Sequence, residues 1–142
     1  MKKERIVVAL GGNALQADQN NISAEAQLIT AKRTAKVLVD LIESGHELII
    51  THGNGPQIGQ IVAMYEKDGI ISMPFPECGA MSQGYIGYHL QQAILSEMLK
   101  RKINRSVATV ITQIVVDKED PRFKNPTKPI GSFYTCEEAK RL

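Results

Sequence analysis

Hydrophobic positions along the chain alternate between short continuous runs and longer stretches with helical spacing. Apolar, β-branched runs at 5–10 and 47–51 are each stopped by glycines, as is typical of strands buried on both faces of a parallel sheet. Ser23 and Gly45 are the expected N-cap and C-terminal residue of a helix between these strands. Its apolar residues recur at steps of three and four and share one face: Leu28, Ala31, Ala35, Leu38 and Ile42.

The same pattern continues through the next part of the chain. It predicts a short helix over about 57–65, an irregular loop at 70–76, a long helix over about 80–101 and a third strand at 107–116. Strands joined by helical crossovers form right-handed βαβ units. We therefore expect an α/β fold, a three-layer α/β/α sandwich with a mainly parallel sheet.

The composition changes after residue 116, where charges and prolines replace the apolar pattern. We expect residues 1–116 to form the α/β domain and 117–134 to form a small protruding flap or subdomain. Residues 135–142 begin a helix, because Thr135 and Glu138 have the spacing of a capping box. This helix has a start signal but no stop signal, so we expect more protein to follow.

Charge and composition exclude several classes of protein. Hydrophobic residues make up 43% of the chain and charged residues 23%, which is typical of a globular domain. A net charge of +2 is too balanced to indicate a nucleic-acid partner, and the basic cluster at 100–105 is expected to close the long helix. No apolar run approaches the roughly 20 residues that span a bilayer. With no signal-peptide pattern either, we expect a cytoplasmic protein.

Cysteine and histidine give no sign of a metal site. Cys78 and Cys136 are far apart in sequence and are expected to be reduced thiols. His46, His52 and His89 lack metal-ligand spacing, and we expect His52 to be structural. Chemistry must therefore come from other residues.

Two glycine-rich loops follow the first two strands. The first loop, Gly11-Gly12-Asn13, ends the first strand. The second loop, at 51–56, contains Gly53, Asn54 and Gly55. Ligands of open parallel sheets bind beyond the carboxyl ends of the strands. Because glycine has no Cβ, such loops take positive φ and bring backbone N–H groups close to an anion. The two loops together favour a phosphate or carboxylate site, although each alone fits a tight turn.

Neither loop matches a known nucleotide fingerprint: there is no P-loop, and the second loop misses the GxGxxG spacing by one residue. A reacting anion also needs a cation. Lys128 lies in the flap-like segment and could neutralise charge on a phosphoryl group in transfer. Taken alone, it is more typical of a solvated loop lysine.

Four segments of the chain together resemble the carbamate kinases, a branch of the amino acid kinase family: 8–15, 51–57, 81–88 and 128–134. The resemblance runs through the whole chain in the right order. Related kinases that phosphorylate other carboxylates usually carry a lysine two residues before the Gly-Gly pair, where this chain has Ala9. In carbamate kinases the protruding subdomain is thought to supply that charge, and Lys128 matches there.

The resemblance implies an enzyme that transfers a phosphoryl group between carbamoyl phosphate and ADP, with Mg²⁺, usually as a homodimer. Lys128 would be the catalytic residue. Gln83, at the expected start of the long helix, is a weaker candidate. The residues that would hold carbamate or the transferred phosphoryl group are Gly11, Gly12, Asn13, Gly53, Asn54 and Gly55.

Two departures from the family leave alternatives open. Ser132 stands where the family usually has proline. The family is also roughly double this length, and its second half carries the nucleotide pocket and further catalytic residues. The chain could therefore be a non-catalytic anion-binding or dimerising module. A different acyl-phosphate kinase of the same fold is the third alternative, and Ala9 argues against it.

Overall fold

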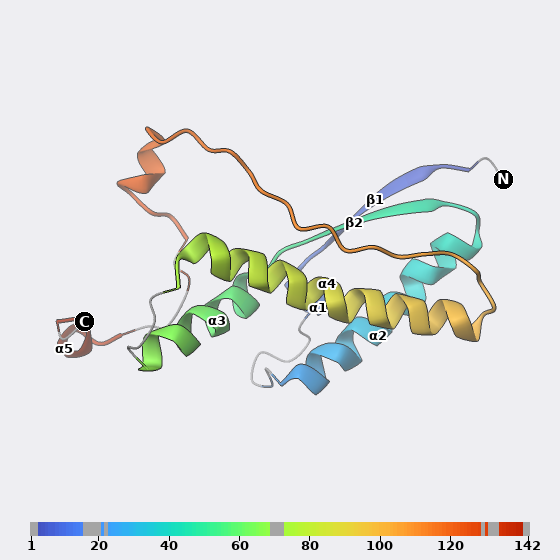
Figure 1. The fold of residues 1–142 in the computed structure, drawn as a ribbon, viewed down its shortest axis with the longest axis horizontal. Helices are drawn as coiled ribbons and strands as arrows, with labels where there is room; N and C mark the ends of the chain where they lie inside the picture. Colours follow the sequence, from blue (N-terminus) through green and yellow to red (C-terminus); the bar gives the residue numbers. More distant parts are fainter. Residues whose placement is uncertain are drawn as a thin grey trace. The chain divides into compact units, whose positions relative to one another are not determined.

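A computed structural model of the chain describes residues 3–15, 21, 23–68, 73–128, 130 and 134–140. It divides into two compact units, one of residues 1–54 with 83–111 and one of residues 55–82 with 112–142. The elements, in chain order (Figure 1), are β1 (Arg5–Leu10), α1 (Gly12–Leu15), α2 (Ala24–Glu43), β2 (Glu47–His52), α3 (Gly55–Asp68), α4 (Phe75–Lys100), the 3₁₀ turn η1 (Pro121–Phe123) and α5 (Cys136–Ala139).

The first unit is built on two parallel strands. β1 and β2 pair in register from Arg5 opposite Glu47 to Leu10 opposite His52, and α2 forms the crossover between them. The expected parallel α/β class is confirmed. Helices α2 and α4 lie on the same side of this sheet (Figure 1).

The prediction that both faces of the sheet are buried, however, is wrong for the described residues. Val7 is 63% exposed and Ile49 47% exposed, because successive side chains of a strand point to opposite faces and only one face meets the helices. On that inner face, Val8, Leu48 and Ile50 pack against the core. Its buried residues are Leu10, Leu15, Ala31, Ala35, Leu38, Val39, Ile86, Leu90, Ala93, Ile94 and Met98.

Helix α2 begins and ends as the sequence indicates. The Ser23 hydroxyl oxygen accepts a hydrogen bond from the Ala26 amide at 3.2 Å. At the other end, Gly45 has φ 97°, and the His46 amide donates to the Leu41 carbonyl at 3.2 Å. This is a Schellman motif with glycine in the left-handed position.

Helix α4 begins at Phe75, earlier than expected, because Pro76 lies in its first turn, where a proline costs no helical hydrogen bond. Residues 75 and 76 of the expected loop are therefore helical. Gln83 lies inside α4 rather than at its start. The helix ends at Lys100, and Lys102 takes the left-handed position with φ 57°.

The basic cluster closes this helix, as expected. Arg101 forms ion pairs with Asp40, Glu43 and Glu97, which join the ends of α2 and α4. These carboxylates raise the pKa of the Arg101 guanidinium and keep it charged.

The expected third strand at 107–116 is wrong, because this segment is extended but pairs with no strand of the described residues. Val115 is fully exposed. An apolar, β-branched sequence becomes a strand only when a neighbouring backbone satisfies its N–H and C=O groups.

In the second unit, α3 and the first turns of α4 bury Ile58 and Cys78. Asp120 caps the turn η1, and Thr135 with Glu138 forms the expected capping box at α5. Cys78 and Cys136 are both free thiols. Among the described residues, no helix is long and apolar enough to cross a membrane.

Candidate functional site

The two glycine loops leave the same edge of the sheet. Leu10 and His52 end the paired strands opposite one another, and the Gly53 amide donates to the Leu10 carbonyl at 3.4 Å. The structure therefore brings Gly11 and Gly53 together at the carboxyl ends of β1 and β2. Parallel α/β sheets bind ligands at this edge.

The fold does not itself require glycine at these positions. A Cβ at Gly11, Gly53 or Gly55 would meet no atom within 4 Å, and none of the three has φ in the left-handed region. The expectation of positive φ is therefore wrong for them. Among the described residues, neither packing nor backbone strain therefore demands these glycines.

Hydrogen bonds and core packing fix the backbone of the first loop. Gly12 and Asn13 open the short helix α1, in which the Ala14 amide donates to the Gly11 carbonyl at 3.1 Å. The Thr34 hydroxyl of α2 donates to the Ala14 carbonyl at 2.9 Å. Leu15 is buried in the core, so the backbone of this loop is fixed by the fold.

The second loop uses one of its expected donors within the sheet. The Gly53 amide is directed to Leu10, so it cannot also point at an anion. His52 Nδ1 lies 3.0 Å from the Gly53 carbonyl, where it can donate a hydrogen bond, consistent with the structural role expected for this histidine. Asn54 completes this loop within the first unit, and Gly55 begins α3 in the second.

Lys128 belongs to the second unit and is exposed. Its neighbours Pro129 and Ser132 lie outside the described residues. No group of His, Cys, Asp and Glu side chains in the described part of the chain could hold a metal ion. A magnesium site built from these residues is therefore not supported.

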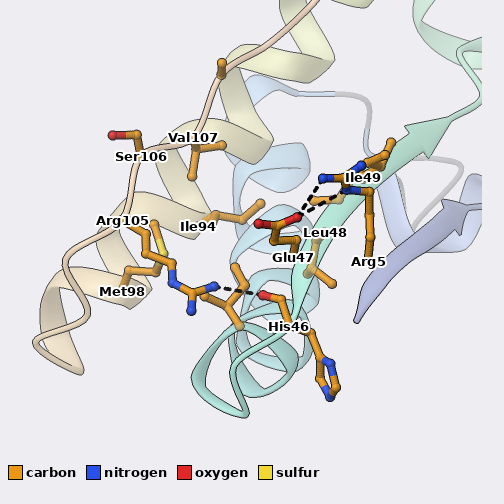
Figure 2. Close-up of a pocket in the computed structure, with 13 residues that line it drawn as sticks. Arg5, His46, Glu47, Leu48, Ile49, Ile94, Met98, Arg105, Ser106 and Val107 are labelled. Atoms are coloured by element: carbon orange, nitrogen blue, oxygen red, sulfur yellow. Dashed lines mark hydrogen bonds and ion pairs between the residues drawn. The ribbon is translucent and has the colours of Figure 1, made fainter. Parts of the chain in front are cut away.

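A cavity of about 400 Å³ lies beside the amino-terminal part of β2 in the first unit (Figure 2). Sequence reasoning missed it, since it forms between elements far apart in the chain. Next to it, Glu47 pairs with Lys3 at 2.6 Å and Arg5 at 3.0 Å, and these cations lower the pKa of its carboxyl. The lining residues are Arg5, Ile42, His46, Glu47, Leu48, Ile49, Ile50, Ile94, Met98, Arg105, Ser106, Val107 and Ala108.

Comparison with known proteins points to one family. The sequence pattern of the amino acid kinase family matches residues 4–125. Carbamate kinase of Clostridium perfringens is 59% identical over 143 residues, covering 97% of this chain and 46% of that protein. Carbamate kinase of Pyrococcus horikoshii is 48% identical, covering 98% and 46%.

Solved structures agree with this. Carbamate kinase from Giardia lamblia bound to AMP-PNP superposes with a TM-score of 0.88 at 38% identity, covering 98% of this chain and 44% of that one. The chain thus spans slightly less than half the length of the relatives it matches.

Proposed function

Because the chain belongs to the amino acid kinase family, we propose that it forms the carbamate- and phosphoryl-binding part of a carbamate kinase. Such an enzyme transfers a phosphoryl group reversibly between carbamoyl phosphate and ADP, giving ATP and carbamate. The observation that carries the proposal is the pair of adjacent loops whose glycines the fold does not require.

In this proposal the two loops have different roles. The amides of Gly12 and Asn13, at the start of α1, donate to the anion. Gly11 and Gly53 admit the anion close to the backbone, since they carry no side chain. Asn54 and Gly55 complete the second side of the site, with Asn54 offering an amide group to carbamate.

Lys128 is proposed to neutralise the charge that develops on the phosphoryl group during transfer. No covalent intermediate is needed, because positioning and charge neutralisation suffice for this chemistry. ADP and Mg²⁺ would be held by the part of the family's fold that this chain does not span. A cytoplasmic homodimer is the proposed working form.

The experiment uses the remaining part of the Clostridium perfringens enzyme, co-expressed with this chain. We expect the pair to form ATP from carbamoyl phosphate and ADP, and Lys128→Ala to lower turnover by about 10²–10³-fold. Lys124→Ala is the control, because Lys124 is an exposed lysine of the same segment. An unchanged rate in Lys128→Ala would remove this lysine from the mechanism.

A second candidate is a non-catalytic anion-binding module, favoured by the share of the relatives that the chain spans. It predicts that carbamoyl phosphate raises the melting temperature of the 142-residue chain, while no ATP forms with or without the remaining part. Turnover by the co-expressed pair would exclude this candidate.

A further inference from the structure

Helix α1 is too short to fix its own orientation. It contains four residues, Gly12–Leu15, and its Ala14 amide donates to the Gly11 carbonyl at 3.1 Å. A single helical turn is not stable on its own in water, and the last carbonyls of any helix have no partner within that helix. The direction of the Gly12 and Asn13 amides therefore depends on the contacts that α1 makes with other elements.

Helix α2 supplies such a contact through Thr34. The half-buried Thr34 side chain donates from its hydroxyl to the Ala14 carbonyl at 2.9 Å, and the two residues are 20 positions apart in sequence. This carbonyl is one of those that α1 leaves without a partner within the helix. Next to Thr34 in sequence, Ala35 belongs to the core cluster that also holds Leu15. The hydrogen bond and the buried Leu15 side chain thus fix the same end of α1.

The threonine one turn earlier in α2 bonds differently. The Thr30 hydroxyl donates to the Ala26 carbonyl of its own helix at 3.0 Å. A bond to the carbonyl four residues earlier is the ordinary one for a threonine inside a helix. Thr34 is the same residue type in the same helix, but its hydroxyl joins α2 to another element and so contributes to tertiary structure.

The bond from Thr34 acts on the first glycine loop at the end away from the sheet. At the other end, the loop continues directly from Leu10, which is buried and is paired with β2. Residues 11–13 therefore lie between two fixed points, Leu10 and Ala14. A displacement of Ala14 changes the direction of the amides between these points, and a misplacement of about 1 Å can lower a reaction rate about 100-fold.

We propose that Thr34 is a positioning residue for phosphoryl transfer. Its hydroxyl holds Ala14, and through Ala14 it directs the Gly12 and Asn13 amides toward the reacting anion. Thr34 acts through the backbone of α1 and needs no contact with carbamoyl phosphate. The inference rests on the proposed function, since the anion is the one proposed for this loop, and it adds a residue of α2 to the groups on which the reaction depends.

Two valine substitutions on α2 separate positioning from simple stability. Thr34→Val removes the hydroxyl bonded to α1, and Thr30→Val removes a hydroxyl bonded within α2, while both keep a β-branched side chain. Each variant is co-expressed with the remaining part of the Clostridium perfringens enzyme. We expect Thr34→Val to lower kcat about 10- to 100-fold and to leave the KM for ADP within about twofold of the parent value. Thr30→Val should keep the parent kcat.

Thr34→Ser is the rescue variant. Serine keeps a hydroxyl at the same position, so it should restore most of the parent kcat, whereas a purely steric role of Thr34 would leave serine as impaired as valine. Equal kcat values for Thr34→Val and Thr30→Val, or a serine variant as slow as the valine variant, would overturn the role of the hydroxyl. Thr34→Ala replaces Thr34→Val in this comparison if the valine variant does not fold.

Hydrogen exchange of the Ala14 amide distinguishes this inference from the proposed function, because it requires neither substrate nor turnover. We expect this amide to exchange about tenfold faster in Thr34→Val than in the parent or in Thr30→Val. An unchanged exchange rate would overturn the coupling between Thr34 and α1, whatever the catalytic activity. Faster exchange combined with a parent pair that forms no ATP would instead reject the proposed function, and would reduce Thr34 to a structural contact.

Discussion

Two groups of glycines in the first unit differ in what the fold asks of them. Gly11 and Gly53, at the carboxyl ends of the strands, have open space where a Cβ would stand and no left-handed φ. Gly45 follows α2 with φ 97°, and a Cβ at Gly87 of α4 would clash with the Thr109 side chain. Conformation explains Gly45 and close packing explains Gly87, whereas neither explains the loop glycines.

The difference separates glycines that build the fold from glycines that we propose to serve a ligand. A substitution at Gly45 or Gly87 should unfold or strain the chain. A substitution at Gly11 or Gly53 should leave the chain folded and change only what it binds. Substitutions at Gly53 and Gly87 test that separation directly.

Gly53→Val should abolish ligand binding while leaving the fold intact. The added side chain meets no protein atom at Cβ but occupies the space proposed for the anion. We expect the rise in melting temperature caused by carbamoyl phosphate to disappear, and the free energy of unfolding without ligand to stay within about 0.5 kcal/mol. A variant that carbamoyl phosphate still protects would place the site elsewhere.

Gly87→Ala should have the opposite result. The added Cβ would clash with Thr109, so we expect a loss of about 1–2 kcal/mol in the free energy of unfolding. Gly84→Ala is the matched control on the same helix, because its Cβ would lie 4.0 Å from Ile111. It should be neutral or stabilise by up to about 1 kcal/mol. Urea denaturation of both variants checks this, and equal stabilities would refute the packing argument.

Lowering the pH should decrease the free energy of unfolding without any substitution. His89 of α4 is 8% exposed and lies 4.7 Å from the ring of Tyr85, and burial lowers its pKa. The unfolded chain, with a histidine pKa near 6.5, then binds more protons than the folded chain below that pH. Stability is therefore full above about pH 6.5 and falls as the pH drops toward the lower folded pKa.

Melting temperatures measured from pH 7.5 to 5.5 check this, with His89→Gln as the comparison. The variant should lose less stability over that range than the parent chain. If the melting temperatures of the two proteins fall equally, another group governs stability over this pH range.

Lys102→Gly should give a small gain in stability. Lys102 adopts φ 57° after α4, where the Ile103 amide donates to the Met98 carbonyl at 2.9 Å in a Schellman motif. A side chain is strained in this conformation, so glycine should stabilise the chain by about 0.5–1 kcal/mol. Gly45→Ala, at the equivalent position after α2, should destabilise it by a similar amount. Thermal unfolding measures the stability of the two variants. Changes in stability of the same sign would contradict the explanation by backbone strain.

Local signals predicted much of the fold correctly. Ser23 and Gly45 marked the ends of α2, Thr135 with Glu138 marked α5, and the apolar runs marked β1 and β2. Each of these features depends on residues close together in sequence. The start of α4 was missed because Pro76 signals a loop but is also well tolerated in a first helical turn.

The predictions that failed depended on distant neighbours. The segment 107–116 has the composition of a strand, but a strand exists only where a second backbone pairs with it. Burial of β1 and β2 on both faces likewise needs a second layer of helices, which the described residues do not supply.

By itself, the sequence determined the parallel α/β class, the helix boundaries set by capping, and the two glycine loops at the ends of the strands. These follow from side-chain periodicity and from backbone preferences of single residues, which act over a few positions. Only the tertiary structure decided that Gly11 and Gly53 lie together with open space at their Cβ positions and that the Gly53 amide donates to Leu10. It also decided that, among the described residues, β2 keeps an unpaired edge beside a cavity. Those features arise from which backbones come within hydrogen-bonding distance across the fold, and no local pattern of residues specifies that.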